Sequence, residues 1–330
     1  MRGSHFPRSP RLRIALFGFG ILLLIVVALG WWPASRISAP GSSPALDYAT
    51  AHSRVAARLA EPAPGVRPEC RSKVLDHGAR TRDVYVLLHG LTNCPAQFAK
   101  FADLLYARGA NVLLLRLPYH GLADRMTTES AKLTAGDLVA SATEAVNLAH
   151  GYGERVTVIG LSVSGVTAAW IAQTRSDVDL AVVIAPFFAP NGLPNWGITP
   201  LANLLCRLPN GFVWWDSKER ENLAGSPYSY PRFATRTLGE TMRLGLDVFS
   251  RARMWPPAAQ RVLIITSPAD RAISMPRVRQ LATLWGPRAQ SLSFPTDWNI
   301  LHDCIDPAQP GAQVERVYPK LLEWIDAAHE

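Results

Sequence analysis

The feature that most constrains the fold is a series of short apolar runs that alternate with helix-length segments from about residue 74 onward. Six runs have the length of strands, and none alternates between polar and apolar residues as a half-exposed strand does. They cover residues 84–90, 111–118, 155–160, 180–186, 261–267 and 290–295. Continuous apolarity is typical of strands covered on both faces, so we expect an α/β fold with a mostly parallel, doubly wound sheet.

The segments between these runs predict the helices that cover the sheet. Residues 95–108, 131–149 and 165–174 have the length and patterning of helices. A much longer interval follows the fourth apolar run, and a structureless loop of that length is unusual inside a compact domain. We therefore expect an inserted, mostly helical cap at about 187–256. Its tryptophans can either line an apolar substrate pocket or fill the cap's own core.

The N-terminus predicts a membrane anchor. Residues 1–13 contain four arginines, and an apolar run over 14–32 follows them and ends in two tryptophans. The run is close to the roughly 20 residues that cross a bilayer as a helix. A cleaved signal peptide, the competing interpretation, has an apolar region of only about 7–15 residues. By the positive-inside rule we expect the N-terminal end in the cytoplasm and the rest beyond the cytoplasmic (inner) membrane, in the periplasm of a Gram-negative bacterium.

The segment after the apolar run differs in composition from the rest of the chain. Residues 33–68 are rich in Pro, Ser, Ala and Gly, which predicts a tether with a short helix around 48–59. The catalytic domain is then expected over residues 69–330.

The charge of the chain is basic, with 34 Lys and Arg against 26 Asp and Glu. Such a balance fits nucleic acid or an anionic membrane surface. The positive residues are mostly scattered arginines, and no Lys/Arg block of the length used for nucleic acid is found in the sequence. We therefore expect an anionic lipid surface, and no nucleic acid, as the neighbour of this protein.

The strongest chemical motif surrounds Ser162, which lies between a predicted strand and a predicted helix. A serine nucleophile needs a strained strand-to-helix turn with small residues two positions before it and two after it. Gly160 and Ser164 meet this need, although the second is Ser rather than the usual Gly. We expect Ser162 to be the nucleophile. A plain tight turn is the alternative, and Ser164, a poorer elbow, is the second candidate nucleophile.

A second motif begins with His89 and Gly90 at the end of a buried run. Gly90 lets the backbone turn so that the next N–H points at a bound oxyanion, and such donors contribute roughly 3–4 kcal/mol to the transition state. We assign the oxyanion hole to the amides of Leu91 and Val163. His89 is an alternative general base, but its place at the strand end indicates that it braces the loop.

These motifs, in their order along the chain, resemble those of α/β-hydrolases. They are His89-Gly90-Leu91-Thr92, Leu117-Pro118-Tyr119-His120-Gly121 and Gly160-Leu161-Ser162-Val163-Ser164. They are most similar to the bacterial carboxylesterase and monoacylglycerol-lipase-like (serine aminopeptidase-type) group, which shows an HGFTG-like loop followed by a PGHG-like motif. Asn93 and Tyr119 depart from these patterns and leave the subfamily and substrate open. The resemblance covers about residues 74–325 and implies the α/β-hydrolase fold.

The other two members of a catalytic triad follow from chain order, which in this fold runs Ser, acid, His. Asp270 lies just past the run at 261–267, and His302 follows the last predicted strand. His302 is also the only histidine between residue 151 and the terminal helix. We expect Asp270 to orient the imidazole and His302 to be the base. The competing acids, all near His302 in sequence, are Asp297, Asp303 and Asp306; His120 is expected to structure its loop.

Together these residues predict a membrane-anchored serine hydrolase that acts on carboxylic esters through an acyl-enzyme. The anchor and the aromatic cap favour apolar, lipid-derived esters. An amidase or aminopeptidase with the same triad is the enzymatic alternative, and a non-catalytic membrane scaffold is the alternative of another class. The complete set of nucleophile, acid and base argues against the scaffold. No metal or cofactor is expected, and the oligomeric state stays open.

The four cysteines, Cys70, Cys94, Cys206 and Cys304, are far apart in sequence and have no metal-ligand spacing. Their even number is compatible with disulfides in an oxidising compartment. Cys94 and Cys304 both fall in loops expected near the active site, so a bridge between them is one hypothesis. Two isolated thiols packed as small apolar residues are the other.

Overall fold

The computed structural model of the 330-residue chain describes residues 10–32, 36–38, 43–44, 47–220, 222 and 225–330. Within these residues the central sheet has seven strands in the order β1-β3-β2-β4-β5-β8-β9. β1 runs antiparallel to β3, and the other neighbouring pairs are parallel. The strands are β1 (Lys73–Leu75), β2 (Thr81–Leu88), β3 (Asn111–Leu114), β4 (Gly153–Leu161), β5 (Leu180–Ile184), β8 (Arg261–Thr266) and β9 (Ala289–Ser293).

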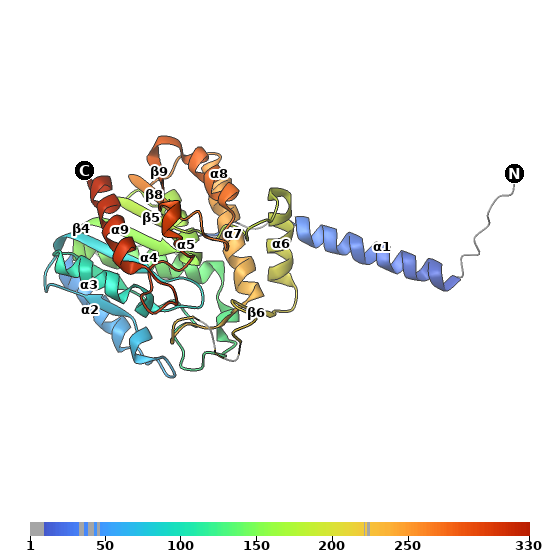
Figure 1. The fold of residues 1–330 in the computed structure, drawn as a ribbon, viewed down its shortest axis with the longest axis horizontal. Coiled ribbons are helices and arrows are strands. Elements are labelled where there is room, and N and C mark those ends of the chain that lie inside the picture. The colour runs from blue at the N-terminus through green and yellow to red at the C-terminus, as the bar shows by residue number, and fades with distance from the viewer. Residues whose placement is uncertain (1–9, 33–35, 39–42, 45–46, 221, 223–224) are drawn as a thin grey trace.

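Helices cover both faces of this sheet (Figure 1). The crossover from β2 to β3 runs along the sheet in the direction opposite to the crossover from β4 to β5, so right-handed connections place their helices on opposite faces. α4 and α5 pack against each other on one face. α3 contacts α9 through the rings of Phe101 and Tyr318. The helices of this layer structure are α3 (Ala99–Ala107), α4 (Ala135–Tyr152), α5 (Val163–Thr174), α8 (Met275–Trp285) and α9 (Val314–His329).

The six predicted strands are all present, which confirms the α/β fold with a mostly parallel sheet. The central residues of β2, β3, β4, β5 and β8 are buried, as continuous apolarity requires, whereas β9 lies at the sheet edge and is half-buried or exposed. β1 was not predicted, because three half-exposed residues at a sheet edge make no apolar run. β2 begins earlier than the apolar run, since Arg82 and Asp83 extend the ladder where it reaches the surface.

The long interval between β5 and β8 contains regular structure and is called the cap below. It holds α6 (Asn195–Arg207), the antiparallel pair β6 (Phe212–Trp214) and β7 (Arg232–Ala234), and α7 (Thr235–Ala252). α7 packs against both α6 and α5, so the cap is continuous with the core. Trp196, Trp215 and Trp255 are exposed, and Trp215 also lines a cavity.

Part of the predicted tether packs on the domain. α2 (Tyr48–Ala60) agrees with the predicted helix, and the Asp47 side chain caps it by accepting the Thr50 amide at 2.8 Å. Ala51 is buried against α4. The approach is so close that a Cβ at Gly151 would lie 2.3 Å from the Ala51 Cβ, so Gly is required there.

The N-terminal helix α1 (Pro10–Trp31) runs away from the domain on the side where α6 lies (Figure 1). Its end is held by Asn203 of α6, whose Nδ2 donates to the carbonyl oxygens of Gly30 and Trp32 at 2.7 and 2.9 Å. Among the described residues, no helix combines the length and the apolar character that crossing a membrane requires. The anchor over 14–32 remains a prediction, and most of the basic segment 1–13 lies outside the described residues.

Candidate active site

Ser162 occupies a sharp turn between β4 and α5. Its backbone has φ 61° and ψ −114°, a region that residues with a Cβ seldom adopt. The surrounding backbone holds this conformation: the Ser162 amide donates to Ile184 O at 2.9 Å, and Ser162 O accepts from Phe187 N at 3.1 Å. The turn therefore lifts the Ser162 side chain from the carboxyl edge of the sheet.

Small residues on both sides make the turn possible. A Cβ at Gly160 would lie 2.0 Å from Ser164 O, and one at Gly165 would lie 2.7 Å from Ile184 O. Ser164 is fully buried, and its hydroxyl donates to the carbonyl of His89. The serine at the position where Gly is usual thus links the elbow to the loop after β2, and its hydroxyl points away from the pocket side of the turn.

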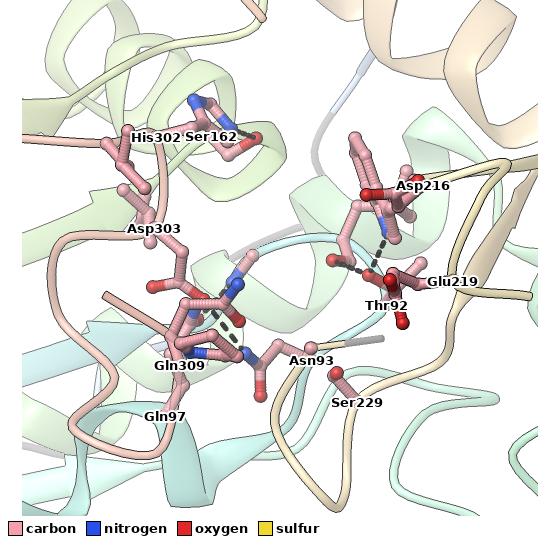
Figure 2. Close-up of a pocket in the computed structure, with 17 residues that line it drawn as sticks. Thr92, Asn93, Gln97, Ser162, Asp216, Glu219, Ser229, His302, Asp303 and Gln309 are labelled. Carbon is pink, nitrogen blue, oxygen red and sulfur yellow. Dashed lines mark hydrogen bonds between the residues drawn. The ribbon is translucent and has the colours of Figure 1, made fainter. Parts of the chain in front are cut away.

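The structure brings Ser162, Asp270 and His302 together from the loops after β4, β8 and β9. Figure 2 shows Ser162 and His302. His302 Nε2 lies 2.9 Å from Ser162 Oγ, and His302 Nδ1 lies 2.8 Å from Asp270 Oδ2. Because a carboxylate can only accept, Nδ1 carries the imidazole proton and Nε2 is left to accept from the serine hydroxyl. Asp270 is itself held, since its Oδ1 accepts the Ala272 amide at 2.8 Å.

Burial and the nearby carboxylates have opposite effects on the pKa of His302. Burial alone lowers its pKa, but the hydrogen bond to Asp270 and the negative charges of Asp270 and Asp303 outweigh burial and raise the pKa above 6.5. The arrangement therefore stabilises an imidazolium when His302 takes up a proton.

The competing acids do not bond to His302. Asp297 lies in a short 3₁₀ turn at the surface. Asp303 and Asp306 accept hydrogen bonds from the loop after β2 and from Tyr228 of the cap. The carboxylates of Asp303 and Asp306 therefore bond to these groups and not to the imidazole of His302.

His89 braces the loop that follows β2. Its Nδ1 donates to Gly90 O at 3.0 Å, and its Nε2 accepts from Leu117 N at 3.1 Å. Burial, followed by the neighbouring His120, lowers its pKa to about 3, so the ring stays neutral. With both nitrogens bonded to backbone, His89 has no lone pair left for use as a base.

Hydrogen bonds hold the orientation of the peptide between Gly90 and Leu91, whose carbonyl oxygen accepts from His89 Nδ1. Gly90 O also accepts from Asn93 N at 3.3 Å, and in a trans peptide the N–H of the next residue points the opposite way. No backbone acceptor is found for the Leu91 amide among the residues described. The Val163 amide is the first of α5, where the helix itself offers no acceptor.

The cap contacts the same loop through Thr92. Trp215 Nε1 donates to Thr92 Oγ1 at 2.8 Å, and the Tyr230 amide donates to Thr92 O at 2.7 Å. Tyr119, which departs from the resembled motif, adopts φ 65°, the left-handed conformation that favours glycine. His120 donates from Nδ1 to Pro118 O at 2.8 Å and so structures this second loop.

A cavity of about 550 Å³ opens on Ser162 and His302 (Figure 2). Its apolar wall includes Leu91, Trp215 and Leu301, and its polar wall carries three carboxylates but, among the described lining residues, no Lys or Arg. The carboxylates are Asp216, Glu219 and Asp303. Such a lining disfavours anionic groups on a bound molecule and leaves room for a small or medium-sized ester.

The cysteines pair differently from the hypothesis. Cys94 forms a disulfide with Cys70, and Cys206 and Cys304 are free, so the proposed Cys94–Cys304 bridge is wrong. Cys94 and Cys70 meet because the short 3₁₀ turns that follow β2 and precede β1 pack together. Cys304 instead points into the main hydrophobic core.

Comparison with known proteins agrees with this geometry. The model of the alpha/beta hydrolase family matches residues 85–303. The chain belongs to the alpha/beta hydrolase family. A comparison with curated protein sequences finds no match.

Several solved structures share the fold at low identity. One of the metagenome-derived lipolytic enzymes LipS and LipT is 18% identical, with a TM-score of 0.60 over 79% of this chain and 99% of its own. The monoacylglycerol lipase of Paleococcus ferrophilus is 18% identical, with a TM-score of 0.59 over 78% and 98%. A monoglyceride lipase of Saccharomyces cerevisiae is 13% identical, with a TM-score of 0.58 over 78% and 91%. These likenesses agree with the expected α/β-hydrolase fold.

The sequence alone does not predict the polar side chains that lie near Ser162 and His302. Asn93 and Gln97 line the cavity and donate hydrogen bonds to Asp303. Gln97 falls in the segment 95–108, which the sequence predicts as a helix, and lies in a 3₁₀ turn at its start. The available signal is the two aspartates that follow His302, Asp303 and Asp306, because buried carboxylates in a loop need hydrogen-bond donors nearby.

Proposed function

We propose that this protein is a serine-dependent carboxylic ester hydrolase with Ser162, His302 and Asp270 as its catalytic triad. The single observation that carries the proposal is the hydrogen-bonded chain from Ser162 Oγ to His302 to Asp270 at the mouth of the cavity. A hydroxyl is a weak nucleophile at neutral pH, and a neutral imidazole held in the correct tautomer activates it.

The mechanism follows from these positions. Ser162 Oγ attacks the ester carbonyl while His302 Nε2 accepts its proton. Asp270 stabilises the imidazolium, which then protonates the departing alcohol. In the proposed mechanism the amides of Leu91 and Val163 donate to the oxyanion. Water, deprotonated by the same His302, attacks the acyl-enzyme and releases the acid and the free Ser162.

The test compares p-nitrophenyl butyrate with the matching p-nitroanilide, using the full-length protein, Ser162→Ala and Ser176→Ala. Ser176 is exposed and lies away from the cavity, so it serves as the matched control. We expect ester turnover in the wild type and in Ser176→Ala, and a loss of at least about a thousand-fold in Ser162→Ala. Faster turnover of the anilide would favour an amidase. A folded wild type that hydrolyses neither substrate would favour the scaffold.

We also propose that residues 14–32 hold the domain at the cytoplasmic membrane, facing the outside. The apolar run and the arginines before it support this, as do the exposed side chains of Phe17 and Leu24, which water solvates poorly. The Cys70–Cys94 disulfide supports an oxidising compartment.

Cell fractionation tests the location. The full-length protein is expected in the membrane pellet after a carbonate wash, and the double variant Leu24→Arg, Val27→Arg in the soluble fraction. Added protease should degrade the wild type in spheroplasts whose inner membrane is intact. Soluble wild-type protein, or protection from the protease, would contradict the proposed anchoring or its orientation.

A further inference from the structure

A buried glutamine joins two loops of the proposed active site. Gln97 is 2% exposed, and its Oε1 accepts the amide of Gly90 at 2.7 Å. Its Nε2 donates to Asp303 Oδ2 at 2.9 Å. Gly90 belongs to the loop that carries Leu91, and Asp303 is the residue after His302. Gln97 thus spans the distance between the oxyanion loop and the loop of the base (Figure 2).

Asn93 makes a second connection between the same loops. Its Nδ2 lies 3.2 Å from Asp303 Oδ2 and 3.4 Å from Asp306 Oδ2, and its Oδ1 accepts the Cys94 amide at 2.9 Å. Asp306 in turn accepts the Tyr228 hydroxyl at 2.5 Å, which brings in the cap. Asn93 stands where the HGFTG-like motif has glycine, and in this chain its side chain joins the two loops.

These bonds complete the restraint on the Gly90–Leu91 peptide. His89 and Asn93 N hold its carbonyl oxygen, and Gln97 holds the amide on the other side of Gly90. A glycine has no side chain to limit rotation, so without these partners the Leu91 amide could turn away from the oxyanion. The hydrogen bond between Gln97 and Asp303 is charge-assisted and therefore stronger than a neutral one.

We propose that Asp303, acting through Gln97, is a positioning residue that holds the Leu91 amide in the orientation the oxyanion needs. This inference rests on the proposed function, because it concerns the geometry of the same site. Asp303 also acts on His302 through its charge, which helps to raise the pKa of that histidine. One carboxylate thus adjusts both the oxyanion donor and the base.

Among the residues that the structure describes, the charges that act on His302 and Asp303 come mainly from carboxylates. His302 is faced by Asp270 from the loop after β8 and by Asp303 from its own loop. Asp303 is faced by His302 and Asp306, with the neutral amides of Gln97 and Asn93 opposite. Burial, followed by the charge of Asp306, raises the pKa of Asp303 to about 6. Near neutral pH and above, Asp303 is ionised and both of its effects are present.

The experiment measures ester hydrolysis by the full-length protein, Asp303→Asn, Gln97→Leu and the double variant. The matched control is Asp179→Asn, since Asp179 also accepts a buried backbone amide, at 2.8 Å from Val156 N, but lies at the opposite end of the strands. Thermal melting of every variant identifies the folded fraction. We expect kcat to fall about ten-fold or more in each single variant, with KM nearly unchanged, because the donor acts in the transition state.

Two further results separate positioning from a structural role. The double variant should be little slower than Gln97→Leu alone, because both changes break one chain of contacts. Asp303→Asn should also move the acidic limb of the kcat/KM profile to lower pH, because it removes a charge that raises the pKa of His302.

Several outcomes would overturn the proposal: unchanged kcat, additive losses, a fixed acidic limb, or an equal loss of kcat in Asp179→Asn. A wild type that is folded but inactive on all esters would refute the proposed function itself. The wild-type measurement therefore distinguishes that failure from the failure of the positioning role.

Discussion

Gly160→Ala is the substitution that tests the nucleophile elbow most sharply. The added Cβ would lie 2.0 Å from Ser164 O and 2.6 Å from Ser164 C, whereas ordinary contact begins at 3.4 Å. Both neighbours are backbone atoms, so the turn itself must move by more than about 1 Å. A displacement of that size in a reacting group costs about a hundred-fold in rate, equivalent to about 2.7 kcal/mol in the activation free energy.

The assay is steady-state hydrolysis of p-nitrophenyl butyrate, with thermal melting to measure the folded fraction. The matched control is Gly136→Ala in the first turn of α4, where the nearest atom, Thr134 Oγ1, would be 3.5 Å from the new Cβ. We expect the control to keep its rate and its stability. A folded Gly160→Ala protein with a rate within a few-fold of the wild type would refute the strained-turn explanation.

Three further predictions concern the triad, acid stability and the disulfide. Asp270→Asn should lower kcat by about 10⁴, because the amide favours the wrong tautomer of His302; a loss under ten-fold in pH-rate assays would speak against this role. His120 has its pKa lowered to about 4, chiefly by burial, so the unfolded chain takes up this proton first and stability falls below pH 6.5. Urea unfolding should show the wild type losing about 2 kcal/mol more than His120→Gln between about pH 7 and pH 5, and equal losses would contradict the assignment. Cys94→Ser should lower the unfolding free energy by about 3 kcal/mol, since Cys70 and Cys94 are 24 residues apart, and an unchanged melting temperature would argue against the bridge.

The inner strands β3, β2, β4, β5 and β8 could be predicted from the sequence because burial on both faces requires a continuous apolar run. The same logic placed Ser162, Asp270 and His302, since each follows the carboxyl end of a predicted strand and such ends share one edge of the sheet. β1 escaped prediction because a short edge strand needs no such run.

The disulfide could not be predicted because its geometry depends on tertiary packing. Cys94 meets Cys70 through the contact of two short turns, and nothing in their spacing distinguishes that pair from Cys94 and Cys304. The link from Gln97 to Asp303 is of the same kind, because it joins residues 206 positions apart through side chains alone.

The central claim is that Ser162 is the nucleophile of an esterase, and covalent labelling tests it most directly. The full-length protein, Ser162→Ala and Ser164→Ala would be treated with a fluorophosphonate and examined by intact mass and peptide mapping. We predict one adduct, on Ser162, in the wild type and in Ser164→Ala, and none in Ser162→Ala. An adduct on Ser164, or a folded wild type that remains unlabelled, would contradict the claim.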